Sequence, residues 1–338
     1  MLQWSLSIAT RDRPEYLYRC VKCALLQTLP PKDIVVVESG RNHKDSELAV
    51  RRAFSETGKD VCLTFEVSPI QSISVQRNRA IDLSLGDIVF VIDDDSYMAI
   101  ECAERVMAIY ELDLDCQIAG LMPLLSGVNF FSGVKQGLPD QNSESFTKKL
   151  SRIAASLKDS FKGEIIAPWI INNSSTVMAS SRKNIVPTNV LHGCRMTFRK
   201  SIVSKYRFDE NITAVHEETE LCARIARDYS LVQLLDPLIF HDEATFHFVG
   251  RNSGAYRTKF ILGQAYLNLK LSEDREKAYK YVCRYARRTI IIDAILGLLH
   301  RDLSKMRGAI KGYRGIHIFK NLFDADLSRA YRDLWSKA

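Results

Sequence analysis

The first half of the chain alternates short apolar runs with longer amphipathic stretches. The apolar runs, at 5–9, 33–37, 62–67 and 87–92, have the length and residue types of strands, and the second and fourth are nearly continuous, as in strands buried on both faces. The stretches at 15–27, 45–57 and 74–83 place apolar residues at helical spacing, and Pro14 stands where a helix can start. This βαβαβαβ pattern predicts a mostly parallel central sheet in a three-layer α/β/α sandwich.

The second half of the chain is less regular. Residues 124–187 are rich in Gly, Ser, Asn and Pro, with only short apolar pieces, which is typical of loops that face a ligand. A second ordered block covers 192–247, and the pattern is helical from 256 onward. We therefore expect one α/β domain followed by a C-terminal helical extension.

Composition places the chain among globular proteins. Its 338 residues are 46% hydrophobic and 26% charged, which supports a packed core. The longest nearly apolar run, at 289–300, is shorter than the roughly 20 residues that cross a bilayer and contains Asp293, so we expect no transmembrane helix. No basic segment followed by an apolar one opens the chain, and its eight cysteines are too few for a disulfide scaffold. We expect reduced cysteines and a cytoplasmic location.

Positive charge is concentrated near the C-terminal end. The net charge is +7, yet residues 257–338 alone hold 18 Lys and Arg against 8 Asp and Glu. This region has no zinc-finger or RNA-recognition signature, and its basic residues alternate with Leu, Ile and Tyr as on an amphipathic surface helix. We expect no nucleic acid partner and predict peripheral association with the anionic inner face of a membrane. The alternative is a helical cap on the preceding domain.

Three carboxylates, Asp93, Asp94 and Asp95, directly follow the fourth predicted strand. They would repel one another unless a cation or hydrogen bonds compensate their charge. A hard divalent ion that bridges carboxylate and diphosphate oxygens is one solution, since Mg²⁺ and Mn²⁺ prefer oxygen ligands. The alternative is an acidic turn that caps the following helix.

Polar residues also follow the other strands. Thr10-Arg11-Asp12-Arg13-Pro14 follows the first, Glu38-Ser39-Gly40 follows the second, and Gln76-Arg77-Asn78-Arg79 lies on the helix before the acidic strand. Ligands of open α/β sheets bind at the carboxyl ends of the strands, where these groups could hold phosphates, a base and a ribose. Neither GxGxxG nor GxxxxGK[ST] occurs, so the usual dinucleotide and P-loop signatures are missing.

A second acidic segment, at 216–224, starts a predicted helix. Glu217, Glu220 and Arg224 share one face, whereas Glu218 lies with Leu221 and Cys222 on the apolar side. A carboxylate on the apolar side tends to have a raised pKa, which suits a general base. The alternative is ordinary acidity at a helix start, which complements the helix dipole.

Taken together, these segments and Gly193-Cys194-Arg195-Met196-Thr197-Phe198-Arg199 have the order and spacing found in the family 2 glycosyltransferases. The chain closely resembles that family over about residues 3–250. The resemblance implies a GT-A fold, a nucleotide-sugar donor, a divalent metal (Mn²⁺ or Mg²⁺) and an inverting transfer. The donor is expected to be UDP-linked and the acceptor a glycan or lipid-linked glycan of cell-surface polysaccharide synthesis.

The resemblance also assigns roles to residues. Glu218 would be the catalytic base, at a position where the family more often has Asp. Asp93 and Asp95 would bind the metal, together with His241 or His247, of which His247 is slightly favoured by the stretch that follows it. The donor would be held by Thr10, Arg11, Arg13, Glu38, Arg77, Asp93, Asp94 and Gly193.

The resemblance divides the chain at residue 255. Residues 1–255 would form the catalytic domain, with a donor-binding half at 1–123 and an acceptor-binding half at 124–255, and 256–338 would form the basic helical region.

Two other functions stay open from the residues alone. One is a GT-A-like nucleotidyltransferase, which shares the carboxylates at a strand end but does not need Glu218. The other is a catalytically silent module that binds nucleotide sugars or glycans.

Overall fold

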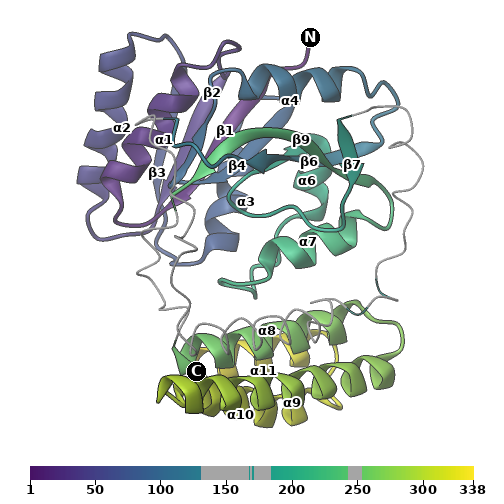
Figure 1. The fold of residues 1–338 in the computed structure, drawn as a ribbon. Coiled ribbons are helices and arrows are strands. Elements are labelled where there is room, and N and C mark those ends of the chain that lie inside the picture. The colour runs from purple at the N-terminus through teal and green to yellow at the C-terminus, as the bar shows by residue number, and fades with distance from the viewer. Residues whose placement is uncertain (131–166, 168–169, 171–183, 243–252) are drawn as a thin grey trace, which may run out of the picture. The chain divides into compact units, whose positions relative to one another are not determined.

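The computed structural model describes residues 1–130, 167, 170, 184–242 and 253–338 (Figure 1). These residues belong to two compact units. The first contains the described residues from 1–130 and 184–242, and the second contains 253–338 together with Ala167 and Ile170.

The first unit begins with the parallel strands that the sequence predicts. Strands β1 (Trp4–Thr10), β2 (Asp33–Glu38), β3 (Cys62–Val67) and β4 (Ile88–Asp93) lie in the order β3-β2-β1-β4, and all three pairings are parallel. Helices α1 (Pro14–Leu25), α2 (His43–Thr57) and α3 (Ile73–Leu83) connect them. Each element lies within two residues of its predicted range, because alternating apolar runs and helical spacing are strong local signals.

The sheet continues beyond β4 with strands of both directions. Its order from there is β8 (Met196–Arg199), β6 (Ile118–Leu125), β9 (Ser230–His241) and β5 (Ser96–Met98), and β7 (Ile185–Pro187) also pairs with β9. Strand β8 is antiparallel to β4 and β6, and β5 is antiparallel to β9. Helices α4 (Cys102–Glu111), α6 (Lys200–Tyr206) and α7 (Glu217–Ile225) also belong to this unit.

Alternating side chains of the central strands pack against two helical layers. On β4, Ile88 and Phe90 belong to the core cluster that includes residues of α1, α2 and α4, whereas Val89 and Val91 belong to the cluster with residues of α6 and α7. Because successive side chains of a strand point to opposite faces, the sheet is covered on both sides. The predicted three-layer α/β/α sandwich with a mostly parallel sheet is confirmed.

The second unit is helical. It contains α8 (Gly254–Leu271), α9 (Arg275–His300), α10 (Ser304–Ile316), the short 3₁₀ helix η3 (His317–Phe319) and α11 (Asp324–Ser336). Tyr266 of α8 stacks on Tyr331 of α11 with ring centroids 4.3 Å apart, and both side chains are fully buried. Among the described residues, no helix combines the length and the apolar composition that crossing a membrane requires.

Candidate active site

Three parallel strands end at the same edge of the sheet. The register pairs Thr10 of β1 with Glu38 of β2, and Ala9 with Asp93 of β4, so the residues that follow these strands are neighbours. The acidic turn leads into strand β5, and the next helix, α4, begins only at Cys102. The alternative in which this turn caps the following helix is therefore wrong.

Asp94 is held inside the protein by residues that follow β1. Its carboxylate accepts hydrogen bonds from the Thr10 hydroxyl at 2.6 Å and from Arg13 Nη1 at 2.6 Å. Burial raises the pKa of Asp94 to about 7, although the charge of Arg13 acts in the opposite direction. Thr10 and Arg13 thus fix the first turn after β4.

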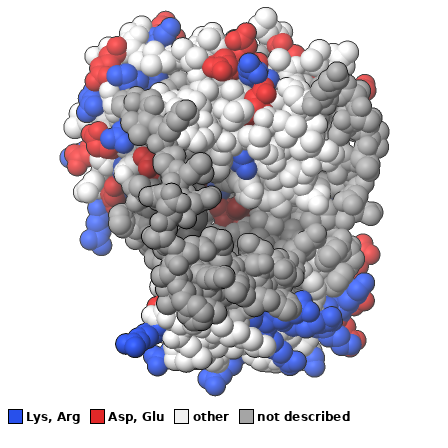
Figure 2. All heavy atoms as spheres, viewed as in Figure 1, with Lys and Arg blue, Asp and Glu red and all other residues white. Residues whose placement is uncertain are grey.

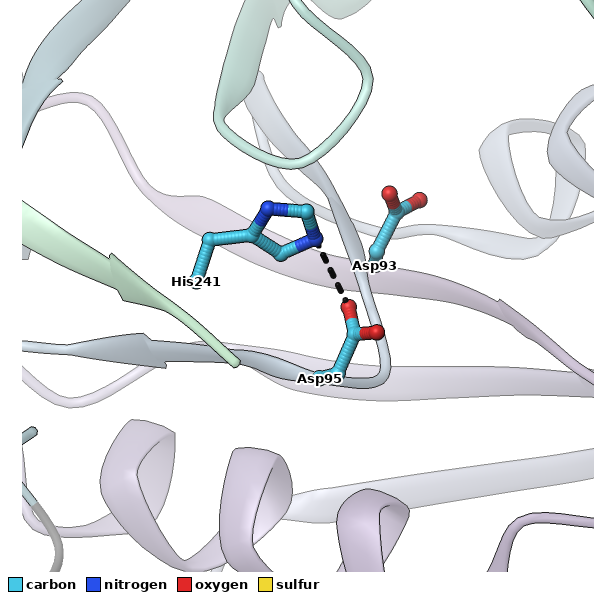
Figure 3. A group of neighbouring side chains, drawn as sticks. All are labelled: Asp93, Asp95 and His241. Atoms are coloured by element: carbon cyan, nitrogen blue, oxygen red, sulfur yellow. Dashed lines mark ion pairs between the residues drawn. The ribbon is translucent and has the colours of Figure 1, made fainter. Parts of the chain in front are cut away.

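Asp95 belongs to a group of three possible metal ligands. Pairing of β5 with β9 places Ser96 opposite His241, and His241 Nε2 lies 3.1 Å from Asp95 Oδ1 (Figure 3). One ligand atom from each of Asp93, Asp95 and His241 lies within 4.8 Å of the others. Two carboxylates and one imidazole this close together could hold a divalent ion between them.

The charge of Asp95 is well compensated. Its other oxygen, Oδ2, accepts a hydrogen bond from Arg13 Nη2 at 2.6 Å. Burial alone would raise the pKa of Asp95, but His241 and Arg13 together hold it below its usual value. Asp95 is therefore an anion at neutral pH, as a metal ligand must be.

Arg77 of α3 joins the strand-end carboxylates to helix α7. Its Nη2 lies 2.8 Å from Asp93 Oδ1, and its Nη1 lies 2.8 Å from Glu217 Oε1. The Arg77 side chain is 2% exposed. The two ion pairs fix the orientation of Asp93 and hold the N-terminus of α7.

Glu218 is the next residue of α7. Burial, and then the neighbouring charge of Glu217, raise the pKa of Glu218 to about 8, although Arg77 lowers it. Glu220, in contrast, forms a bidentate ion pair with Arg224 of the same helix, at 2.6 and 2.7 Å, and its side chain is buried. The raised pKa of Glu218 suits a general base near neutral pH.

The backbone before α7 is strained. Val215 and His216 have φ values of 68° and 73°, in the left-handed region that β-branched and bulky residues rarely adopt. Both residues directly precede Glu217 and Glu218. Such strain is concentrated at functional sites, where surrounding contacts maintain it.

Glu38 is fully buried at the end of β2. Its Oε1 accepts hydrogen bonds from the backbone N–H groups of Asp12, at 3.1 Å, and Gly40, at 2.7 Å. Its Oε2 is buried and receives no hydrogen bond from the described part of the chain. A Cβ at Gly40 would lie 2.2 Å from Asp12 Oδ1, so this turn requires glycine. An orphaned buried acceptor is costly, and a donor group of a ligand would satisfy it.

The other predicted residues are distributed around this site. Arg11 is half-buried, directly after β1. Gly193 lies beside Arg77, because a Cβ there would be 2.7 Å from Arg77 Nη2. His241 stands in the group of possible ligands, and His247 lies outside the described residues.

Sequence reasoning missed three features of the site. Glu217 is the partner of Arg77, Val215 and His216 carry the strain, and Gly40 lets the turn after β2 approach Asp12. Only the glycine had a signal in the sequence, because it follows a strand end directly. The other two depend on how segments far apart along the chain meet.

Comparison with known proteins adds a family and a fold. Residues 5–205 match the model of the family described as glycosyl transferase family 2, which is more than half of the chain. No curated protein sequence matches the chain at a significant level.

Solved structures of glycosyltransferases share the fold at low sequence identity. Mannosyltransferase PcManGT from Pyrobaculum calidifontis, in complex with GDP-Man and Mn²⁺, is 14% identical with a TM-score of 0.54, and the match covers 100% of this chain and 88% of that one. GalNAc-T7 with UDP, GalNAc and Mn²⁺ is 13% identical with a TM-score of 0.57, covering 93% and 55%. S. aureus TarS 1–349 in complex with UDP-GlcNAc is 13% identical with a TM-score of 0.50, covering 99% and 91%.

Proposed function

The chain belongs to glycosyl transferase family 2, and from that premise we propose that it is a metal-dependent, inverting glycosyltransferase. It would move a sugar from a nucleotide sugar to an acceptor hydroxyl. The observation that carries this proposal is that Arg77 connects two clusters of acidic residues. It contacts Asp93, which belongs to the possible metal site, and Glu217, which is next to Glu218. A GT-A-like nucleotidyltransferase would not need the second group, so both this geometry and the family favour glycosyl transfer.

Glu218 is the proposed base. Its carboxylate would take the proton of the acceptor hydroxyl while that oxygen forms a bond to the anomeric carbon. The bond between the anomeric carbon and the diphosphate breaks in the same step, the nucleoside diphosphate leaves, and a single displacement inverts the anomeric centre. The raised pKa of Glu218 matches this role because a base that titrates near the working pH transfers protons efficiently.

Asp93, Asp95 and His241 would hold the metal. A divalent ion bound there would supply positive charge that stabilises the departing diphosphate. The imidazole of His241 favours Mn²⁺ over Mg²⁺, because Mg²⁺ strongly prefers oxygen ligands. Two of the similar structures contain Mn²⁺, which supports the same choice.

The donor would lie along the strand ends. Glu38 Oε2, which receives no hydrogen bond from a described residue, could accept one from a donor group of the nucleoside, and Arg11 follows β1 at the same edge. We propose a UDP-linked donor, in line with the UDP-GlcNAc and UDP complexes among the similar structures, with a GDP-linked sugar as the main competitor.

We propose the same division of the chain as the sequence suggests. Residues 1–255 would be the catalytic domain, with a donor half at 1–123 and an acceptor half at 124–255, and 256–338 would be an accessory helical region. The acceptor would be a glycan or lipid-linked glycan in cell-surface polysaccharide synthesis, and the protein would act in the cytoplasm. The described residues of the proposed site all belong to the first unit, which supports a catalytic domain separate from the helical region. The boundaries of the two units differ from the proposed ones, because residues 253–255, Ala167 and Ile170 belong to the second unit.

Calorimetric titration tests the proposal. The full chain is titrated with UDP, GDP and their sugar conjugates, with Mn²⁺, with Mg²⁺ and with a chelator. We expect one nucleotide to bind tightly only with a divalent ion, and incubation of the matching nucleotide sugar with Mn²⁺ to release free nucleoside diphosphate. Binding without turnover on any donor would favour the silent binding module, and metal-independent binding would overturn the metal site.

A further inference from the structure

Helix α9 exposes apolar side chains on its outer side. Ile291, Ile295 and Leu298 are 60%, 46% and 72% exposed, although they are large and aliphatic. Their spacing of four and three residues places them in one stripe along the helix. Large aliphatic residues of a helical unit normally face its interior. In this half of α9 they face the solvent instead.

The inner side of α9 explains why the stripe cannot turn inward. Asp293 is 2% exposed and forms a bidentate ion pair with Arg257 of α8, at 2.7 and 2.9 Å. Gly297 packs against the turn after the helix, where an added Cβ would lie 2.7 Å from the Asp302 carbonyl oxygen. Rotation of α9 would break a buried ion pair and leave both charges uncompensated, which is strongly unfavourable.

Basic residues continue the same face toward the N-terminus of α9. We define the α9 outer face by its exposed members: Lys277, Lys280, Arg284, Arg287, Arg288, Ile291, Ile295 and Leu298. The face is cationic over its first half and apolar over its second. Figure 2 shows Lys and Arg side chains gathered on the helical unit, whose residues from 257 onward carry 18 basic against 8 acidic side chains.

We propose that the α9 outer face docks on an anionic membrane surface, with the basic half on lipid headgroups and the apolar stripe at the boundary of the acyl chains. A nucleic acid would use the charges but would not need the exposed aliphatic stripe. A second copy of the chain could cover the stripe, but its basic residues would then repel their counterparts. The proposal goes beyond the transfer reaction, and neither depends on the other.

Co-sedimentation with vesicles tests this docking. The full chain is mixed with vesicles of phosphatidylcholine alone or with added phosphatidylglycerol. We expect binding to the anionic vesicles that falls steeply with salt, because salt screens exposed charges. Replacing the stripe in Ile291→Asn/Ile295→Asn/Leu298→Asn should lower the partition coefficient at least about tenfold. Arg284→Gln/Arg288→Gln should lower it by about tenfold as well.

Matched changes in the first unit serve as controls. Leu48→Asn/Leu114→Asn removes side chains that are 65% and 87% exposed, and Lys44→Gln/Lys59→Gln removes exposed charges; both should leave vesicle binding unchanged. All variants should keep nucleotide binding, so loss of docking is distinguishable from failure of the proposed function. Equal binding to neutral vesicles, or α9 variants that bind like the controls, would overturn the proposal. The proposal would also be overturned if the natural chain formed a dimer without lipid and Ile291→Asn/Ile295→Asn/Leu298→Asn dissociated that dimer.

Discussion

Asp95 and Glu218 of the first unit are both carboxylic acids, and their pKa values are shifted in opposite directions. At the end of β4, Asp95 contacts Arg13 and His241, and its pKa is held below the usual value despite burial. At the start of α7, Glu218 lies beside another carboxylate, and its pKa is raised to about 8. Burial acts in the same direction at both positions, so the neighbouring residues decide the outcome.

This difference teaches how a single site can provide two functions. A metal ligand must stay ionised, whereas a general base must bind a proton readily during the reaction. Pairs of acidic groups whose surroundings drive their pKa values apart mark such a division of roles. Arg77 forms ion pairs with Asp93, two residues before Asp95, and with Glu217, next to Glu218, so it connects the two places.

The largest expected effect is on turnover. Glu218→Gln removes the proton acceptor with almost no change in volume, so transfer should fall roughly 10²- to 10⁴-fold while nucleotide and metal affinity stay within about twofold. Glu220→Gln on the same helix is the control: it loses the ion pair with Arg224 and should melt at lower temperature, but it should keep its turnover per folded molecule. Near-normal transfer by Glu218→Gln would place the base elsewhere, with Glu217 the next candidate.

The next effect is on stability and concerns the link between the two groups. Arg77→Met leaves Asp93 and Glu217 without their shared partner, and we expect a loss of about 3 to 5 kcal/mol in the free energy of unfolding. Arg79→Met, two residues away, breaks an exposed bidentate pair with Glu66 and should cost at most about 1 kcal/mol. Urea denaturation measures both. If Arg77→Met does not fold, Arg77→Lys keeps the charge and should give an intermediate loss; equal losses for positions 77 and 79 would contradict the link.

The link also separates what the sequence can predict from what it cannot. Strands such as β2 and β4 and the helices between them follow from apolar periodicity. Asp93 to Asp95 were identified as candidates because they directly follow such a strand, and Glu218 because it lies on the apolar side of a predicted helix start and matches the family's motif. Arg77 and Glu217 are 140 residues apart, and no local pattern indicates that they meet.

The geometry of the possible metal site could not be predicted either, because short strands position its residues. Strand β5 has three residues and β8 has four, too few for a periodic signal, and they are stabilised by pairing with strands distant in sequence. His241 reaches Asp95 only because β5 pairs with β9. From the sequence, therefore, the choice between His241 and His247 could not rest on geometry.

The third effect is on metal binding. Asp95→Asn removes one anionic ligand of the possible metal group but keeps a hydrogen-bonding side chain, so Mn²⁺-dependent nucleotide affinity should fall on the order of 10²-fold. Asp113→Asn is the matched control, because Asp113 is also a buried carboxylate paired with an arginine, Arg199, and lies outside that group. Calorimetry with UDP or GDP and Mn²⁺ measures both variants. Affinity that falls equally in both would assign the metal to a different set of residues.

The smallest expected effect is on the pH dependence of stability. It tests whether the pKa values of Glu218 and Asp95 are shifted in opposite directions. The pKa of Glu218 is raised in the folded chain. Below its ordinary pKa of roughly 4.3, Glu218 is protonated in both the folded and the unfolded chain, so the contribution of Glu218 to stability is fully present. As pH rises toward and through about 8, the unfolded chain ionises at little cost while the folded chain resists, and that contribution is lost. Glu218→Gln does not titrate. Its free energy of unfolding relative to the natural chain should therefore rise by a few kcal/mol between pH 5 and 8.

Asp95→Asn should show the opposite sign in the same urea denaturation series. Because the pKa of Asp95 is lowered in the folded chain, its contribution is present above its ordinary value of roughly 3.9 and is lost as pH falls through the folded-state value. The natural chain should therefore be more stable than Asp95→Asn near pH 6, and this advantage should shrink in acid. Opposite slopes for the two variants require that Arg13 and His241 compensate one carboxylate while Glu217 repels the other. Slopes of the same sign would mean that burial alone governs both groups, and the division of roles between metal ligand and base would lose its electrostatic basis.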